Sequence, residues 1–305
     1  MLAALALALT PPGDDPQTAP FDISFHNQTA AYRDQTVSVL PGASLTIDAR
    51  GGTPGAYNLQ AAAGDVFRHS DRQWVWQAPA EAGLYDLKVT ASDHEITLHA
   101  FVTVPASQVR GGLLNGYRIG SYPGTPLNGN PIYRPPPGFI EVTKANRSTK
   151  VSPHFRLEQF LCKEDTTDTY PKYVVIDERL PLKLEAILER VNALGFHVET
   201  LHVMSAYRTP FYNHAIGDVL YSMHQWGSAA DIFVDRKVSG QMDDLNRDGR
   251  IDVADAKYLY DAIEQMLTEP AFVTLQGGMG FYPATTAHPP FVHVDVRGTK
   301  ARWKG

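Results

Sequence analysis

The chain has 305 residues, enough for one large domain or two of medium size, each with its own core. Hydrophobic residues make up 43% of it, charged residues make up 20%, and the net charge is −6. This balance gives no reason to expect nucleic acid or an anionic membrane surface as a partner. The single cysteine, Cys162, excludes an internal disulfide framework and a cysteine-based zinc site. Its neighbours in FRLEQFLCKED predict a buried structural thiol.

The first ten residues, MLAALALALT, are apolar and rich in alanine, like the hydrophobic region of a signal peptide, although no basic residues precede them. Ten apolar residues are too few to span a bilayer. We interpret residues 1–20 as a signal-like segment followed by a flexible tether, PPGDDPQTAP. We therefore expect an exported protein, periplasmic or associated with the cell envelope, without a stable membrane span.

Residues 21–105 contain short runs of strand-like sequence separated by Pro, Gly, Asp and Ser turns. The runs are TVSVL, SLTIDA, QWVWQAP, GLYDLKVTA and EITLHAFVTV. Their spacing predicts a small antiparallel β-sandwich, immunoglobulin-like in general style. Trp74 and Trp76 fall on one face of their strand, and we expect them in the core rather than on a ligand platform. No catalytic constellation occurs in this part of the chain.

Residues 106–150 are rich in Gly, Pro, Asn and Tyr. Aromatic residues recur too often for a free linker, so we expect an extended arm that lies on the following domain. In residues 151–305, Ser152 and Pro153 predict the start of a short helix that continues through Leu161. A longer helix is expected to end at Gly195, with an apolar stripe formed by Leu184, Ile187, Leu188, Val191 and Leu194.

The strands expected next are HVETLHVMSAY, SAADIFVD and PFVHVDVRG, which together with the helices predict an α+β domain. A catalytic zinc site needs three protein ligands and one open position. His224 and Asp231 are two candidate ligands, and FVHVD offers His293 on another strand. Strand alternation places His293 and Asp295 on one face and the intervening valines on the other. The spacing of His224 and Asp231 alone is a weak signal in a chain with 11 histidines.

Several separated motifs resemble one known family. They are MSAYRTPFYN, YSMHQWGSAADIF, GGMGFYP and AHPPFVHVDVRGTKARW. The part of the chain from about Gly112 to Trp303 resembles the D-Ala-D-Ala carboxypeptidase-like zinc peptidases of the M15 type. These belong to a wider group with the lysostaphin-type enzymes and the hedgehog signalling domain. The resemblance implies a domain with an antiparallel sheet and helices, and hydrolysis of peptidoglycan stem peptides in cell-wall remodelling, by D,D-carboxypeptidase or endopeptidase activity.

The resemblance also implies roles for single residues. His224, Asp231 and His293 would be the zinc ligands. Arg208 would hold the substrate carboxylate or the developing oxyanion, with Tyr207 and Ser222 of the same motifs in the substrate-binding region. His288 would match a histidine that assists the tetrahedral intermediate. Without the motif around it, we would interpret Arg208 as part of a surface salt bridge.

The chain departs from the family pattern where the general base is expected. Many members carry an acidic residue three positions before the last zinc-binding histidine, or a histidine two positions before it. Those positions here are Pro290 and Phe291. Asp295 and His288 are the remaining candidates, and we favour Asp295 as a base or as a residue that orients a ligand imidazole. The departure keeps open an alternative, a non-catalytic metal-containing module that binds the cell wall or a protein.

A second metal motif lies between Asp231 and His293. DLNRDGRIDVAD, residues 244–255, fits a calcium loop of the EF-hand or dockerin type. Asp244, Asn246 and Asp248 take its first, third and fifth positions, Arg250 offers its carbonyl, and Asp255 closes it. We expect a structural calcium site in an insertion. A polar turn rich in Asp and Asn is the simpler alternative, and a scaffold that docks a partner through this loop is a third.

Overall fold

The computed structural model describes residues 17–26, 28–51, 57–164 and 167–305. Most of the predicted signal-like segment, residues 1–16, therefore lies outside the described residues. The chain divides into two compact units. Unit 1 contains the residues up to Gln108 together with Pro137–Leu157, and unit 2 contains Val109–Pro136 and Glu158–Gly305. The segment 106–150, expected to form one arm, is divided between them.

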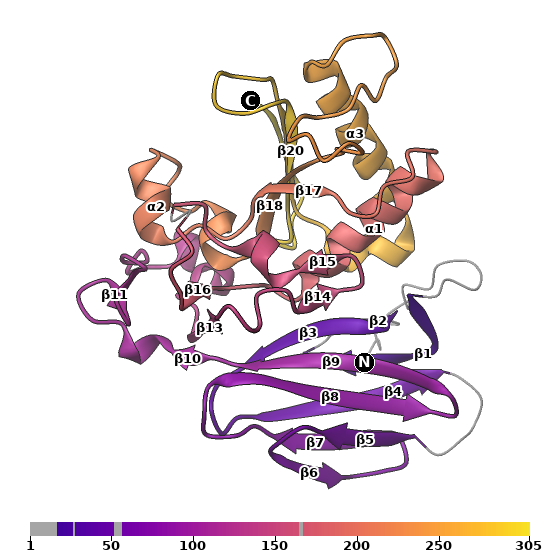
Figure 1. Ribbon diagram of the computed structural model, residues 1–305, viewed down its shortest axis with the longest axis vertical. Coiled ribbons are helices and arrows are strands. Elements are labelled where there is room, and N and C mark those ends of the chain that lie inside the picture. Colours follow the sequence, from indigo (N-terminus) through magenta and orange to yellow (C-terminus); the bar gives the residue numbers. More distant parts are fainter. Residues whose placement is uncertain (1–16, 27, 52–56, 165–166) are drawn as a thin grey trace. The chain divides into compact units, whose positions relative to one another are not determined.

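Unit 1 is a sandwich of two β-sheets (Figure 1). The strands of the first sheet, in the order in which they pair, are β2 (Gln28–Tyr32), β1 (Thr18–Phe25), β4 (Ser44–Gly51), β7 (Gln73–Gln77) and β6 (Asp65–Arg68). Those of the second are β3 (Asp34–Val39), β9 (His94–Val102), β8 (Gly83–Ala91) and β5 (Asn58–Ala61). The predicted sandwich is thus present, but it is not wholly antiparallel, because β3 pairs with β9 in parallel.

The core of unit 1 lies between the two sheets and follows the alternation of the strands. Trp74 and Trp76 are 2% and 0% exposed and belong to this core, which confirms the prediction for both. The remaining elements of unit 1 are β10 (Val104–Pro105), the 3₁₀ helix η1 (Ala106–Gln108), β13 (Gly138–Val142), β14 (Lys150–Ser152) and β15 (Phe155–Arg156). Strand β10 pairs with β13.

The helix predicted from Ser152 through Leu161 is wrong. Ser152 ends β14 and pairs with Phe155 of β15, so the two residues between them form a tight hairpin turn. Pro153 therefore occupies the second position of a turn, where its fixed φ is as favourable as at the start of a helix. Only the 3₁₀ helix η4 (Leu157–Phe160) follows.

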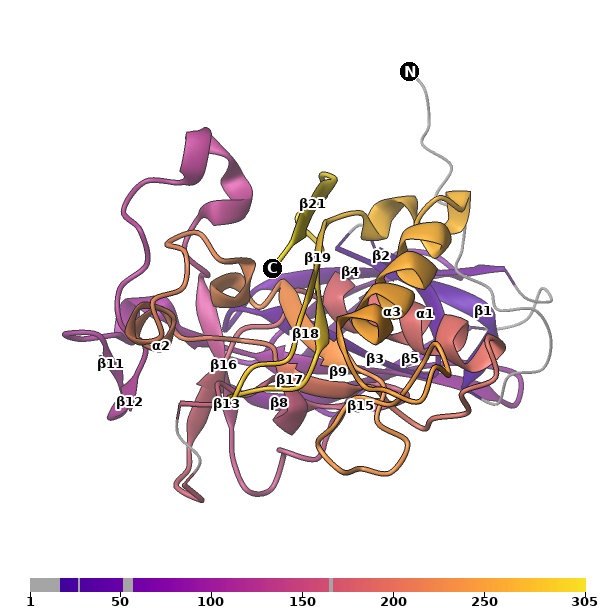
Figure 2. The same ribbon diagram turned by 90° about the horizontal axis from the view of Figure 1, so that it is seen from above.

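Unit 2 is built around a sheet whose strands pair in the order β17 (His202–Ser205), β18 (Ala229–Phe233), β20 (Phe291–Asp295), β19 (Gly278–Tyr282) and β21 (Ala301–Lys304). All neighbours are antiparallel except β19 and β21. Helix α3 (Val253–Met266) packs on β19 and β20, and α1 (Arg179–Ala193) packs on α3 (Figures 1 and 2). Helix α1 and the turn at Gly195, with φ of +88°, confirm the predicted long helix. Leu194, which was predicted to lie on its apolar stripe, instead follows the last helical residue and is 40% exposed.

The shorter elements of unit 2 are β11 (Leu113–Leu114), β12 (Tyr117–Arg118), η2 (Leu127–Gly129), η3 (Pro131–Tyr133), β16 (Lys172–Val174), α2 (Pro210–Ala215), η5 (Met223–Trp226) and η6 (Pro270–Leu275). Residues 109–136 pack within this unit, where Tyr133 joins Met223 and Trp226 in a small apolar cluster. The indole N–H of Trp226 donates to the carbonyl of Arg134 at 2.9 Å. No helix in the described part of the chain is long and apolar enough to cross a membrane.

One face of the sheet in unit 2 carries a row of residues in register across its strands. Ser205 is opposite Asp231, which is opposite His293, followed by Gly280 and Trp303. Residues on the alternate positions of β19 and β20 face the other way, toward α3, whose Tyr260 contacts Phe281. The helices therefore cover one face, and the predicted metal ligands lie on the other.

Candidate metal centre

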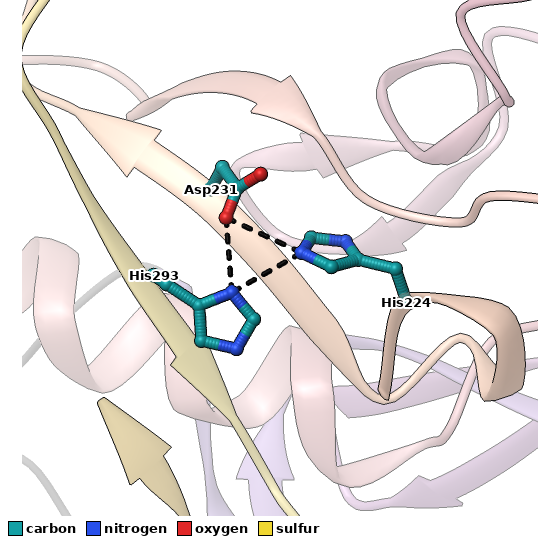
Figure 3. A group of neighbouring side chains, drawn as sticks. All are labelled: His224, Asp231 and His293. Carbon is teal, nitrogen blue, oxygen red and sulfur yellow. Dashed lines mark hydrogen bonds and ion pairs between the residues drawn. The ribbon is translucent and has the colours of Figure 1, made fainter. Parts of the chain in front are cut away.

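Three buried side chains converge in unit 2. The Nε2 atom of His224, the Oδ1 atom of Asp231 and the Nδ1 atom of His293 lie 3.0 to 3.2 Å from one another (Figure 3). All three residues are buried, with exposures of 1%, 2% and 7%. Among the described residues, no second group of three or more His, Cys, Asp or Glu side chains converges in this way. The three ligands expected from the sequence are thus brought together.

His224 is placed by a loop rather than by a strand. It lies in η5, which ends at Gly227 with φ of +65°. A Cβ atom at this glycine would lie 2.0 Å from the carbonyl oxygen of Val175, so no larger residue fits the close approach. The Nδ1 atom of His224 lies 2.6 Å from the carbonyl oxygen of Ala206, and its own carbonyl accepts from the N–H of Arg208 at 3.1 Å. The MSAYR and YSMHQW motifs therefore hold each other in place.

The hydrogen-bond pattern around the three residues fits a cation between them. The N–H of His224 Nδ1 donates to Ala206, which leaves a lone pair on Nε2. The Nε2 atom of His293 is buried without a hydrogen-bond partner, and Asp295 Oδ2 lies 3.5 Å from it. A proton on this Nε2 would face the carboxylate, and Nδ1 would then present a second lone pair to Asp231. With both rings neutral in these tautomers, the three converging atoms could hold a metal ion, and two imidazoles with one carboxylate are a zinc donor set.

The protonation states of His224, Asp231 and His293 follow from burial and from their neighbours. Burial lowers the pKa of His224 despite the attraction of Asp231, which favours the neutral ring that a metal requires. Burial would raise the pKa of Asp231, but His224, His293 and Arg208 hold it well below its usual range. Burial likewise opposes protonation of His293, but Asp231 and Asp295 raise its pKa overall.

Arg208 holds the second oxygen of the Asp231 carboxylate. Its Nη2 donates to Asp231 Oδ2, its Nη1 donates to Asp218 Oδ2 at 2.8 Å, and its Nε donates to Ser205 Oγ at 2.9 Å. Each nitrogen of the guanidinium thus has a partner within the protein. The predicted contact of Arg208 with a substrate carboxylate would require one of these partners to be given up, most easily Asp218, which is the more exposed of the two carboxylates.

Asp295 has the surroundings of an orienting residue and not those of a base. Its carboxylate is 0% exposed and accepts from the backbone N–H of Gly278 at 2.7 Å and from the guanidinium of Arg297. Burial opposes ionisation, but His293 and Arg297 outweigh it and hold the pKa of Asp295 far below its usual range. A carboxylate that is so weakly basic is a poor proton acceptor, whereas one beside a ligand imidazole can fix its tautomer.

No family model matches the chain, and no curated protein matches it. A solved structure that matches is described as the titin M10–obscurin-like 1 Ig complex. The match has 20% sequence identity, covers 28% of this chain and 94% of that one, and has a TM-score of 0.19. A TM-score this low assigns neither a fold nor a function.

Tyr207, Ser222 and His288 were also expected at the site, but within the described residues no side-chain hydrogen bond, ion pair or ring contact joins them to His224, Asp231 or His293. Tyr207 is 1% exposed, and its hydroxyl lies 3.3 Å from that of Tyr122, so it is a buried structural residue rather than a substrate contact. Ser222 is also buried, and its backbone N–H donates to Val219. The Nδ1 atom of His288 lies 2.9 Å from the carbonyl of Pro289, and its ring packs edge-on against Phe291.

Three residues near the predicted ligands were not predicted from the sequence, namely Asp218, Trp303 and Tyr282. Asp218 is held by Arg208, and Trp303 has its ring centroid 5.2 Å from that of His293. The indole N–H of Trp303 in turn donates to the hydroxyl of Tyr282 at 2.6 Å. Tyr282 and Trp303 belong to the GGMGFYP and AHPPFVHVDVRGTKARW motifs, but their pairing could not be predicted, because spacing does not give the register of β19 and β21.

The predicted calcium loop is an ordered turn that leads into α3. The carboxylate of Asp244 accepts from the N–H groups of Asp248 and Gly249, and Asn246 Oδ1 accepts from Asp248. Asp255 is buried and accepts from the backbone N–H of Leu245, Asn246 and Asp252. Arg250 donates its backbone N–H to Asp248. The calcium site stays a prediction, because these carboxylates bind backbone amides and do not meet at one point.

Proposed function

We propose that this protein is an exported zinc-dependent peptidase that hydrolyses peptidoglycan stem peptides, as a D,D-carboxypeptidase or an endopeptidase. The observation that supports hydrolysis is the convergence of His224 Nε2, Asp231 Oδ1 and His293 Nδ1 at 3.0 to 3.2 Å in a buried site. Three protein ligands leave a fourth position open, as in catalytic zinc sites. The substrate class rests on the resemblance of four motifs to the M15-type peptidases.

The residues around this centre would have different roles in hydrolysis. Zinc, when bound, would polarise the scissile carbonyl and activate a water molecule. His224, Asp231 and His293 would hold it, with Asp295 orienting His293 and Arg208 orienting Asp231. In the hydrolysis itself a water oxygen bonds to the carbonyl carbon, the C–N bond breaks, and one water proton passes to the leaving nitrogen.

Asp218 is our candidate for the group that carries this proton. Arg208 bridges its carboxylate and that of Asp231, and the side chain of Asp218 is 27% exposed. It is therefore near the ligands and accessible, which Asp295 is not. Asp218→Asn keeps the hydrogen bond from Arg208 and removes the basic oxygen. We expect kcat to fall by about two orders of magnitude with zinc content unchanged.

The decisive experiment is mass spectrometry of muropeptides after digestion with the zinc-loaded full chain. Release of a terminal D-amino acid identifies a carboxypeptidase, and release of cross-linked halves identifies an endopeptidase. The product should disappear in His224→Ala. It should persist in His214→Ala, which changes an exposed histidine on α2. Stem-peptide cleavage at full rate by zinc-free protein would contradict the proposal.

A second candidate is favoured by Pro290 and Phe291, which occupy the positions of the usual base. In this case the unit keeps its metal and binds the cell wall or a protein without hydrolysing it. A zymogram on purified peptidoglycan, run with and without chelator, separates the two candidates. Retention on peptidoglycan without any cleared band or soluble product would support the binding module.

A further inference from the structure

Trp303 and Tyr282 extend the site beyond the ligands. Trp303 pairs with Gly280, which pairs with His293, so the indole stands in the same row as the ligand ring. Its ring centroid lies 5.2 Å from that of His293, and its Nε1–H donates to Tyr282 Oη at 2.6 Å. The Trp303 indole therefore contacts the proposed metal ligand His293 and also orients the Tyr282 hydroxyl through a hydrogen bond.

Two glycines of β19 leave the space that the Trp303 indole occupies. A Cβ atom at Gly280 would lie 2.1 Å from Trp303 Nε1, and one at Gly278 would lie 2.9 Å from the Trp303 ring. Neither distance is compatible with a side chain. The indole thus lies directly on the bare backbone of β19, and any residue larger than glycine at position 280 would displace it.

The hydroxyl of Tyr282 is oriented and has a proton to give. The tyrosine ring is stacked on Phe291 with centroids 4.6 Å apart, and the residue is partly exposed. Its oxygen accepts from Trp303, and among the described residues its proton has no acceptor. Burial is the main cause of the raised pKa of Tyr282, the Trp303 hydrogen bond opposes it, and the nearby charges of Asp231 and Asp218 add to it. The hydroxyl is therefore protonated and lies within the electrostatic influence of the site.

We infer that Tyr282 is a catalytic hydrogen-bond donor to a substrate oxygen that becomes negatively charged at this centre, and that Trp303 is its positioning residue. The peptide as substrate rests on the proposed function, whereas the binding of an oxyanion does not. As the water oxygen bonds to the carbonyl carbon, the π electron pair moves onto the carbonyl oxygen. Tyr282 donates a hydrogen bond to that oxygen and keeps its proton, and the pair returns when the C–N bond breaks. Donors aimed at such an oxygen are a major source of rate enhancement.

The test uses inorganic phosphate as a tetrahedral oxyanion and the cobalt-loaded full chain, whose visible absorption reports anion binding. Tyr282→Phe removes only the hydroxyl and keeps the stack on Phe291. We expect phosphate to bind about tenfold more weakly or worse, the effect of one hydrogen bond to a charged group. Tyr260→Phe is the matched control, because this tyrosine contacts Phe281 on the opposite face of the same strand. It should bind phosphate like the wild type.

Trp303→Phe tests the positioning role. It removes the N–H donor, so phosphate affinity should fall, and Tyr282→Phe/Trp303→Phe should be no weaker than Tyr282→Phe alone. Additive losses would show that Trp303 does not act through Tyr282. Metal content and thermal unfolding establish that each variant is folded. If Trp303→Phe loses metal, the comparison of Tyr282→Phe with Tyr260→Phe decides whether Tyr282 is the hydrogen-bond donor.

Unchanged phosphate affinity in Tyr282→Phe, or no phosphate binding by the wild type, overturns the inference. On muropeptides, Tyr282→Phe should lower kcat about a hundredfold with little change in KM. If the wild type hydrolyses no peptide but loses phosphate affinity on Tyr282→Phe, the proposed function fails and the oxyanion site stands. If peptides are cleaved equally by both proteins, the proposed function stands and the role of Tyr282 fails.

Discussion

Asp231 and His293 are direct cross-strand partners in β18 and β20, with Oδ1 and Nδ1 3.0 Å apart. Backbone pairing therefore sets the distance between two of the three proposed ligands, whereas His224 depends on a 3₁₀ turn that is closed by Gly227. Side chains directly opposite each other in an antiparallel pair have Cβ atoms roughly 5 Å apart, close enough for two ligands of one ion. The paired strands thus position Asp231 and His293, and the loop positions His224.

Removal of the loop ligand should abolish metal binding without unfolding the chain. In His224→Ala we expect zinc content, measured by elemental analysis after dialysis, to fall from one equivalent to almost none. The circular dichroism spectrum should be unchanged, because the strand pair does not depend on this ring. His214→Ala, an exposed histidine, should keep its zinc. One equivalent of zinc retained by His224→Ala would show that the ion is held elsewhere.

Replacement of the arginine that bridges the two carboxylates should weaken zinc binding. Arg208→Lys keeps the charge but cannot contact Asp231, Asp218 and Ser205 together. We expect zinc affinity, measured by competition with a chromogenic chelator, to fall about tenfold to a hundredfold. Arg236→Lys changes a half-exposed arginine that pairs with Asp243 and should leave the affinity unchanged. Equal zinc affinities of the wild type, Arg208→Lys and Arg236→Lys would exclude a role of Arg208 in orienting Asp231.

The bare backbone beneath Trp303 predicts a strong effect for a single methyl group. In Gly280→Ala the new Cβ would overlap the indole, so the fluorescence of Trp303 and the thermal stability should both change. We expect a loss of about 1–3 kcal/mol in the free energy of unfolding. Gly124→Ala, where a Cβ meets nothing within 4 Å, is the control. Similar unfolding midpoints for the two variants would refute the packing described for β19.

A buried lysine should make stability depend on pH. Lys183 is 0% exposed and donates to the carbonyl of Asp295 at 2.8 Å. Burial lowers its pKa to about 7, and the nearby Asp295 opposes the shift only in part. Arg179, Arg302 and Glu264 also act on it.

Between pH 7 and pH 10 the unfolded chain holds the Lys183 proton and the folded chain does not, so the free energy of unfolding should rise with pH. The slope from this group is at most about 1.4 kcal/mol per pH unit. Urea unfolding of the wild type and of Lys183→Met at pH 7, 8 and 9 checks this, because the variant lacks the term. Parallel pH profiles of the two proteins would show that Lys183 does not titrate in this range.

The calcium prediction is tested on the loop itself. If residues 244–255 bind calcium, millimolar Ca²⁺ should raise the thermal midpoint of the wild type, and Asp248→Ala should remove the effect. Asp261→Ala changes an exposed carboxylate on α3 that pairs with Lys257, and it should respond to calcium like the wild type. A wild-type midpoint that does not move with Ca²⁺ would establish the simpler interpretation, a polar turn held by backbone hydrogen bonds.

Much of this fold could be predicted from local patterns. Period-two alternation located strands around Trp74 and Trp76, and the stripe on α1 located the helix before Gly195. The three candidate ligands were predicted from motifs, and their side chains do converge. Ser152 and Pro153 predicted the start of a helix but form a hairpin turn, because proline is favourable both in the first turn of a helix and at the second position of a β-turn.

What could not be predicted depends on long-range pairing. The parallel neighbours β3 and β9, and β19 and β21, are joined by contacts that no local pattern encodes. Trp303 therefore could not be placed over Gly280, and Tyr282 could not be recognised as its partner. The burial of Asp295 beneath Arg297 was equally hidden, because alternation gives the face of a strand but not what covers it.

The pairing of Asp231 with His293 also has a consequence for how the chain folds. A shift of β18 by one residue against β20 would turn Asp231 to the helix-covered face and bring Ala230 or Ile232 opposite His293. Both of these side chains are apolar and cannot bind a cation. A bound metal ion would therefore stabilise one strand register alone. During folding it would favour the correctly paired sheet over sheets shifted by one residue.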